Sequence, residues 1–442
     1  MATLGTRVGA STALHRARRV FADAERRETL DTAHEMRTAA QVAETLGNMK
    51  GALMKLGQMV SYLDEGLPEP LRVALAQLQQ DAPPMSAALA AGVVEQELGA
   101  PPDTIFDEWD PVPIAAASIG QVHRAITREG VAVAVKVQYP GVGEAIRADL
   151  GNAGLLLANL SSVFPGLERG PLVAELRERL AEELDYRKEA ANQRLFADYY
   201  AGHPFLMVPG VVDRYSTTRV LTTELAEGVR FSEMETWPQP ERDLAAEAIF
   251  RFVFRGLYRL RAFNGDPHPG NYLFLPGGRV TFVDFGLVKH FTPGDVHHLR
   301  SLIEHMVLRP DPVAFRRAVE DAGFLTRGAP ITDEQAMDYF GHFYEFVQDD
   351  RVATIGEDYA AETVRRFFDA TGPHRDVVRS ANVPAPFVII QRINLGLYAI
   401  LARLRATANW RRLGEEVWPW VDGPPSTPLG REEAAWRART GR

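Results

Sequence analysis

The chain has 442 residues, of which 46% are apolar and 24% are charged, a balance typical of a soluble globular protein of two or three domains. Its formal net charge of -9 argues against non-specific nucleic-acid binding, because such binding needs a basic surface to neutralise phosphates. The sequence contains no cysteine, which excludes disulfides, thiolate metal sites and cysteine nucleophiles. We therefore expect no nucleic-acid partner, and the composition suits a reducing compartment.

The first residues are basic, with four arginines before the first acidic residue, Asp23. This pattern is typical of a transit peptide or of a surface-binding arm, but we favour a solvated terminus. The best candidate for a membrane span, residues 387–404, contains Gln391 and Arg392, which would be costly in lipid, so a buried helix is predicted there. We expect a cytoplasmic protein that can contact a membrane peripherally.

Residues 1–100 are predicted to form an N-terminal helical extension. The segment 23–63 is rich in Ala, Leu, Met, Glu and Arg and contains no proline. Prolines then interrupt the pattern, a second helix is expected over 86–98, and Pro101-Pro102 ends it.

Residues 101–226 are predicted to form a small mixed lobe. The runs 122–126 and 131–137 are β-rich and flank a turn, which indicates a hairpin. A long helix is expected from 171 to about 200, followed by a strand at 219–225.

Residues 227–420 are predicted to form a mainly helical lobe. An apolar helix is expected over 241–263, a short strand hairpin over 272–283, and helices from 291 almost to 418. The tail 421–442 contains Gly, Pro, Ser and Thr, which indicates disorder.

Three oxygen-bearing side chains follow the 241–263 segment in a characteristic order. Asp266 and Asn271 are five residues apart, and Asp284 begins an Asp-Phe-Gly sequence eighteen residues after Asp266. A loop carboxylate can orient or deprotonate an attacking hydroxyl, and an amide oxygen with a second carboxylate can hold Mg²⁺ on ATP phosphates. Each piece alone is a common turn, but the ordered combination favours a kinase arrangement.

Lys136 ends the strand-like sequence Val-Ala-Val-Lys. An exposed edge lysine is the plain interpretation, whereas the functional one is a lysine that pairs with the α and β phosphates of ATP. Its partner would be a glutamate on the following helix. Four acidic residues share one face of that helix by spacing, so the stripe alone does not select the partner: Glu178, Glu182, Asp185 and Glu189.

The segment before Lys136 departs from the glycine-rich loop of protein kinases. Alanines occupy the first two glycine positions, whose β-carbons limit positive φ and close approach to phosphate. We therefore expect this loop to hold nucleotide differently. It contains Ala115, Ala116, Ala117, Ser118, Gly120 and Val122.

Together these motifs resemble the UbiB-type (AarF) family of atypical protein-kinase-like proteins. The resemblance covers about residues 45–290 and includes Lys-x-Gly-Gln at Lys55 to Gln58 and Glu-x-Asp at Glu183 to Asp185. It implies an α+β, protein-kinase-like two-lobed fold with an N-terminal helical extension.

The resemblance also implies roles for individual residues. Lys136 and Glu189 would form the ion pair on the ATP phosphates, and Asp266 would act in the catalytic loop. Asn271 and Asp284 would bind Mg²⁺. The alanine-rich segment would contact the nucleotide, together with the hinge residues Glu224 and Ala226.

A regulatory role is implied for Lys55 and Gln58, whose segment would cover the site where a protein substrate would lie. Their partners would be Glu183 and Asp185. On a regular helix these two acidic side chains point about 200° apart, so both can face Lys55 only if the helix is irregular there.

The function that the resemblance implies is an atypical kinase or ATPase that binds ATP and Mg²⁺. It would support quinone or isoprenoid-lipid metabolism at a membrane surface, with a lipid or quinone precursor as a candidate partner. Two alternatives remain: a small-molecule phosphotransferase, and a nucleotide- or lipid-binding pseudokinase scaffold. No Ala-Pro-Glu follows Asp-Phe-Gly, so a peptide-docking segment is not expected.

Overall fold

The structure, a computed structural model, describes residues 85–117, 119–143, 184–264, 267–359, 362, 374–381, 394 and 396–442. Most of the predicted N-terminal extension lies outside these residues, as do Lys55, Gln58, Ser118, Glu183 and Asp266. The chain forms two compact units. The first contains the described residues up to Ala190 and Val211–Leu225, and the second contains Ala191–Gly210 and Ala226–Arg442.

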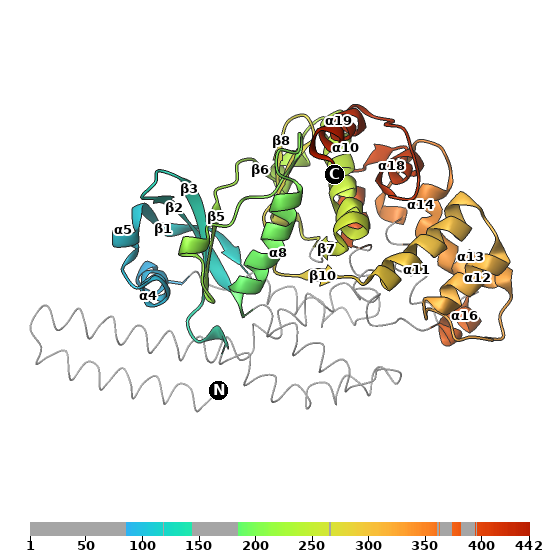
Figure 1. Cartoon of the computed structure of the whole chain (residues 1–442), viewed down its shortest axis with the longest axis horizontal. Coiled ribbons are helices and arrows are strands. Elements are labelled where there is room, and N and C mark those ends of the chain that lie inside the picture. The colour runs from blue at the N-terminus through green and yellow to red at the C-terminus, as the bar shows by residue number, and fades with distance from the viewer. Residues whose placement is uncertain are drawn as a thin grey trace, which may run out of the picture. The chain divides into compact units, whose positions relative to one another are not determined.

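The first unit is built on a four-stranded antiparallel sheet of order β1-β2-β3-β5 (Figure 1). The predicted hairpin is confirmed as β2 and β3, and the predicted third strand as β5. Strand β1 was not expected, because most of its side chains are exposed and its pairing is interrupted around Pro113. The strands are β1 (Phe106–Ala117), β2 (Gly120–Thr127), β3 (Ala132–Gln138) and β5 (Val220–Glu224).

Helix α4 (Ala87–Leu98) covers one face of this sheet (Figure 1). The helix begins where the side chain of Ser86 accepts a hydrogen bond from the Leu89 amide. Its apolar side packs in one cluster with the valines of β3, so α4 belongs to the sheet's core although the sequence grouped it with the extension. The short elements of this unit are α5 (Pro102–Ile105) and the 3₁₀ turn η2 (Asp213–Tyr215).

The second half of the predicted 171–200 helix is present as α8 (Tyr186–Tyr199), and residues 144–183 lie outside the described ranges. The second unit has a four-stranded sheet of order β4-β9-β8-β6 and a two-stranded sheet of β7 with β10. The hairpin predicted over 272–283 is confirmed as β8 and β9. These strands are β4 (Leu206–Met207), β6 (Val229–Arg230), β7 (Ala262–Asn264), β8 (Tyr272–Leu275), β9 (Arg279–Phe282) and β10 (Val288–His290).

The helix predicted over 241–263 ends earlier than expected. Regular helix α10 (Gln239–Arg255) gives way to a π-helical turn, η3 (Gly256–Leu260), and Arg261 then adopts a left-handed conformation before β7. Strand β7 is itself buried, and a continuous apolar run does not distinguish a buried helix from a buried strand.

The rest of the second unit is mainly helical, as predicted. The further helices are α9 (Phe231–Met234), α11 (Pro293–Ile303), α12 (Pro312–Asp321), α13 (Asp333–Gly341), α14 (Glu345–Gln348), α16 (Arg375–Ser380), α18 (Trp410–Val417) and α19 (Pro428–Thr440). Short turns and strands join them: η4 (Pro269–Asn271), η5 (Glu304–Leu308), η6 (His342–Tyr344), β11 (Ala353–Thr354) and β12 (Thr407–Ala408).

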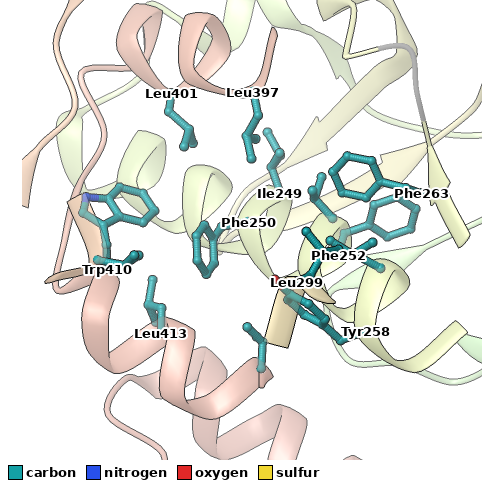
Figure 2. Close-up of a cluster of buried hydrophobic side chains, with 14 of the residues drawn as sticks. Ile249, Phe250, Phe252, Tyr258, Phe263, Leu299, Leu397, Leu401, Trp410 and Leu413 are labelled. Atoms are coloured by element: carbon teal, nitrogen blue, oxygen red, sulfur yellow. The ribbon is translucent and has the colours of Figure 1, made fainter. Parts of the chain in front are cut away.

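The core of this unit is assembled around α10. The Phe250 side chain faces Trp410 and Leu413 of the α18 region, whereas Ile249 lies toward Leu397 (Figure 2). The ring centres of Phe250 and Trp410 are 5.4 Å apart. The described part of the segment predicted as a buried helix is helical from residue 396 and buries Leu397.

The prediction of a disordered tail over 421–442 is wrong. Thr427 caps α19 by accepting a hydrogen bond from the Gly430 amide, and Pro428 occupies the first turn. The helix buries Glu433 and Trp436 almost completely. The amino-acid composition indicated disorder because composition contains no information on this helix cap or on the burial of Glu433 and Trp436. Within the described ranges, no helix combines the length and apolar character needed to cross a membrane.

Candidate functional site

Lys136 lies on the half-buried face of the first unit's sheet. The pairing register places it directly opposite Val122 on β2 and Leu221 on β5, and Val122 lies opposite Ala115 on β1. Directly paired residues share a face, whereas Val135 points to the other face, under α4. The predicted residues Ala115, Val122 and Lys136 therefore lie side by side.

A salt bridge joins Lys136 to Glu189 on the first turn of α8. The lysine Nζ lies 2.7 Å from Oε1 and 2.9 Å from Oε2 of the glutamate, and 5.2 Å from the centre of the Tyr186 ring. The side chains are only 13% and 6% exposed. Because burying an unpaired charge is costly, this geometry selects Glu189 from the acidic stripe as the partner.

Asp185 makes a different pair. Its carboxylate accepts hydrogen bonds from the side chain of Arg187 at 2.9 Å and 2.8 Å, and these bonds hold its pKa below the usual value. Asp185 is the residue before α8 begins, so it is not part of the helix face that carries Glu189.

The three alanines are strand residues. Ala115, Ala116 and Ala117 form the end of β1 and pair with Val122, Gln121 and Gly120 of β2, so the connection between the two strands is only residues 118–119. Alanine suits an extended backbone, whereas the positive φ that glycine permits is not needed in a paired strand. The segment is therefore more regular than the predicted loop.

Gly120 allows β2 and β3 to approach closely. A β-carbon on Gly120 would lie 2.2 Å from the carbonyl oxygen of Val137 and 3.0 Å from the hydroxyl of Tyr186. The first contact is with backbone, which cannot move aside without disturbing the strand that carries Lys136.

We expect Gly120→Ala to destabilise the protein by about 1–3 kcal/mol or more, because overpacking against backbone forces strands apart. Urea unfolding measures the effect. Gly356→Ala is the matched control, since no atom lies within 4 Å of a β-carbon there. Equal stability of the two variants would show that the contact at Gly120 relaxes without cost.

The predicted hinge residues lie where the chain leaves the first sheet. Glu224 is exposed at the end of β5 and pairs with Val133. The amide of Leu225 donates to the carbonyl of Ala132 at 3.0 Å, and Ala226 follows as the first residue of the next unit's main segment.

In the second unit, Asn271 and Asp284 come from neighbouring backbone segments. Asn271 ends η4 just before β8, and its carbonyl accepts a hydrogen bond from the amide of Val283, the residue that precedes Asp284. This bond extends the β8–β9 pairing, so the hairpin fixes the spacing of the two predicted metal ligands. Both side chains are half-buried.

The Asp-Phe-Gly turn is held from both sides. The Asp284 carbonyl accepts from Asn264 Nδ2 at 2.8 Å, and the Asp284 carboxylate Oδ1 accepts from the Gly286 amide at 2.9 Å. Phe285 is fully buried in the core, and its carbonyl accepts from Asn192 Nδ2 at 3.2 Å. The turn therefore has a fixed orientation.

Sequence reasoning missed Asn192 and Asn264 as supports of this turn. The Asn192 side chain bonds both the Phe285 carbonyl and, at 3.0 Å, the ring of His290 on β10. The available signal was position: Asn264 stands two residues before Asp266, where many protein kinases have the His of His-Arg-Asp.

The donors present fit a hard cation. An amide and a carboxylate oxygen are ligands that Mg²⁺ accepts, and Mg²⁺ usually takes only one or two protein carboxylates and completes its shell with water and phosphate. Among the described residues, no group of three or more His, Cys, Asp or Glu side chains is placed to hold a metal by itself. A site in which nucleotide phosphates supply part of the metal's ligands does not need such a group of side chains.

The sheet with a buried lysine–glutamate pair and the Asp-Phe-Gly turn on a strand hairpin define a kinase-like α+β protein. Residues 77–313 match the model of the ABC1 atypical kinase-like domain, and the chain belongs to that family. Both the predicted kinase-like fold class and the resemblance to the UbiB-type family are confirmed.

Curated relatives carry kinase names. The chain is 37% identical over 268 residues to the mitochondrial atypical kinase COQ8B of Rattus norvegicus, which covers 60% of this chain and 51% of that protein. It is 29% identical over 396 residues to the mitochondrial atypical kinase COQ8 of Saccharomyces cerevisiae, covering 86% and 76%. It is 33% identical to the chloroplastic ACTIVITY OF BC1 COMPLEX KINASE 8 of Arabidopsis thaliana, covering 66% and 40%. The match thus spans about half or less of the rat and Arabidopsis proteins.

A solved structure described as the complex of Rv3197 with erythromycin, from Mycobacterium tuberculosis, is also similar. The identity is 34% and the TM-score is 0.64, and the match covers 89% of this chain and 98% of that one. The likeness therefore extends over nearly the whole chain, beyond the family domain itself.

Proposed function

We propose that this chain binds Mg-ATP and acts as an atypical kinase or ATPase. The observation that carries the proposal is the buried Lys136–Glu189 pair in a chain of the ABC1 atypical kinase-like family. The lysine would hold the α and β phosphates, and the glutamate would fix the position of the lysine. The pair is buried on the sheet face that also carries Ala115 and Val122.

The other predicted residues complete this proposal. Mg²⁺ held by Asn271 and Asp284 would neutralise charge on the phosphates. Asp266 would orient or deprotonate the attacking hydroxyl. The alanine-rich end of β1, with Gly120, would lie along the phosphates, and Glu224 and Ala226 would border the adenine.

A role in quinone or isoprenoid-lipid metabolism at a membrane surface is the finer part of the proposal. It rests on the family, whose members compared above include atypical kinases of mitochondria and chloroplasts. The candidate partner is a lipid or quinone precursor. The family resemblance is also the basis for the regulatory roles proposed for Lys55, Gln58, Glu183 and Asp185.

The decisive measurement is ATP hydrolysis by the full chain with Mg²⁺, with and without anionic lipid vesicles and quinone-precursor phenols. Erythromycin is a further ligand to include, because a relative of this chain was solved with it. Stimulation by vesicles or phenols would support the membrane role. Nucleotide binding without turnover under every condition would favour the scaffold alternative instead.

We expect Lys136→Met to lower the rate of ATP turnover by roughly 100-fold or more, because a charge aimed at the reacting phosphates is lost. Lys188→Met is the control, since this lysine is exposed on the same helix as Glu189. Thermal unfolding confirms that both variants fold. If the two variants hydrolyse ATP at the same rate, Lys136 does not have the proposed role.

A further inference from the structure

The second unit contains a cavity of ≈ 70 Å³ within its helical core. Its walls come from α10, η3, α11, α12, α13, η6 and α14, so side chains surround it on several sides. Almost all of them are aromatic or aliphatic; six are Phe254, Leu257, Leu302, Phe315, Phe340 and Phe346. Phe250, Tyr258 and Leu299, which also line it, are seen among the buried side chains of Figure 2.

Two hydroxyl groups in this wall are available for hydrogen bonding. Among the described residues, none forms a hydrogen bond with the hydroxyl of Tyr258 or of Tyr344, and neither oxygen is among the fully buried polar atoms, so both keep accessible surface. Burial raises the pKa of both phenols well above the usual range, so both hydroxyls keep their protons. Tyr398, which lines the same cavity, differs because its hydroxyl donates to the Phe343 carbonyl at 3.1 Å.

The cavity also borders two π-helical turns. Leu257 and Tyr258 belong to η3, and η5 directly follows Ile303, another lining residue at the end of α11. π-Helical turns are rare and occur frequently at functional sites. A simple packing defect would not explain these turns. The two accessible hydroxyls in the wall also supply the few polar groups that a ligand site needs to fix orientation.

We propose that this cavity is a binding site for a small, mainly apolar molecule that carries one hydrogen-bonding group. A volume of ≈ 70 Å³ holds roughly five to seven probes of water size, which corresponds to a ligand of about five to eight non-hydrogen atoms or the end of a longer one. Mainly apolar walls with a few polar groups that fix orientation are typical of ligand sites. The proposal does not depend on ATP binding.

Toluene and benzyl alcohol are suitable probes, because they have similar size and differ in one hydroxyl. We expect both to raise the unfolding temperature of the parent protein saturably. Hydrogen exchange should slow on binding in 254–260 and 299–303, which contribute residues to the wall. Absence of saturable binding, or protection confined to other segments, would overturn the proposal.

Two kinds of variant test the site itself. Leu302→Phe fills the cavity and should weaken binding of both probes at least tenfold, whereas Leu244→Phe, on α10 outside the cavity, should not. Should Leu302→Phe fail to fold, the exchange pattern of the parent decides the location.

The hydroxyls are tested by the double variant Tyr258→Phe with Tyr344→Phe. It should weaken benzyl alcohol binding by roughly 2–10-fold, the worth of a hydrogen bond, and leave toluene binding unchanged. Tyr398→Phe is the matched control, because its hydroxyl already has a partner. Equal affinity of benzyl alcohol for parent and double variant would refute the proposed class of ligand.

Discussion

Replacement of Arg251 by methionine is expected to cost about 3–5 kcal/mol of stability, the loss typical when one partner is removed from a buried ion pair. Arg251 is fully buried on α10. Its guanidinium donates to Glu247 at 2.8 Å, to Glu416 at 2.7 Å and to Glu433 at 2.8 Å. Methionine would fill much of the volume but leave these carboxylates without their shared cation.

The cluster has an excess of negative charge that makes Arg251 critical. It contains two arginines and three glutamates, since Arg255 also binds Glu433 at 2.8 Å and 3.0 Å. Burial alone would raise the pKa of Glu433, but Arg255, His203 and Arg251 lower it well below the usual value. Burial raises the pKa of Glu247 despite Arg251, so Glu247 is the carboxyl that most readily takes a proton when the cation is lost.

Urea unfolding followed by tryptophan fluorescence measures the loss. Arg412→Met is the matched control: Arg412 pairs with Asp350 at the surface, where the side chains are 42% and 49% exposed, and such pairs contribute about 1 kcal/mol or less. If Arg251→Met does not fold, Arg251→Lys, which keeps one charge, should give an intermediate loss. Equal stability of Arg251→Met and Arg412→Met would show that the cluster contributes nothing.

This buried ion-pair cluster could not be predicted from the sequence. Glu416 comes from α18 and Glu433 from α19, and they meet Arg251 only in the folded unit. Periodicity and composition report local structure, so they gave the β2–β3 and β8–β9 hairpins but not this long-range network. The tail 421–442 was misjudged although Thr427-Pro428 is a local start signal for a helix, because the buried partners that anchor α19 lie far away in sequence and give no local signal.

For the candidate site, the sequence predicted more than it did for this cluster. The residue order Lys136, Asp266, Asn271, Asp284 could be read from the sequence because the chemistry requires particular side chains at set intervals. Spacing alone could not select Glu189, since four acids share it. The family resemblance named Glu189, and in the fold Glu189 is buried against the lysine. The paired strand geometry of Ala115–Ala117 was missed for a related reason: exposed residues in β1 carry no alternating apolar pattern.

Replacement of Asp284 by asparagine is expected to abolish the stabilisation by Mg-ATP while leaving the fold intact. Asparagine has nearly the same shape, and its side-chain oxygen can still accept the Gly286 amide that the carboxylate Oδ1 accepts at 2.9 Å. The Asp284 carbonyl still receives the Asn264 side chain, because that contact is with the backbone. The lost property is the negative charge, which is what a carboxylate ligand gives to Mg²⁺.

Thermal unfolding with and without Mg-ATP measures this directly. Ligand at 100 times its dissociation constant should stabilise the parent by about 2.7 kcal/mol, and the same concentration should leave Asp284→Asn essentially unchanged. Addition of EDTA to the parent should reproduce the behaviour of the variant, since both remove the metal from the nucleotide. Asp321→Asn is the control for loss of a carboxylate, because Asp321 is exposed and pairs with Arg327 at the surface. If Mg-ATP stabilises Asp284→Asn as much as the parent, Asp284 is not a metal ligand, and the Mg-ATP site must be sought elsewhere in the chain.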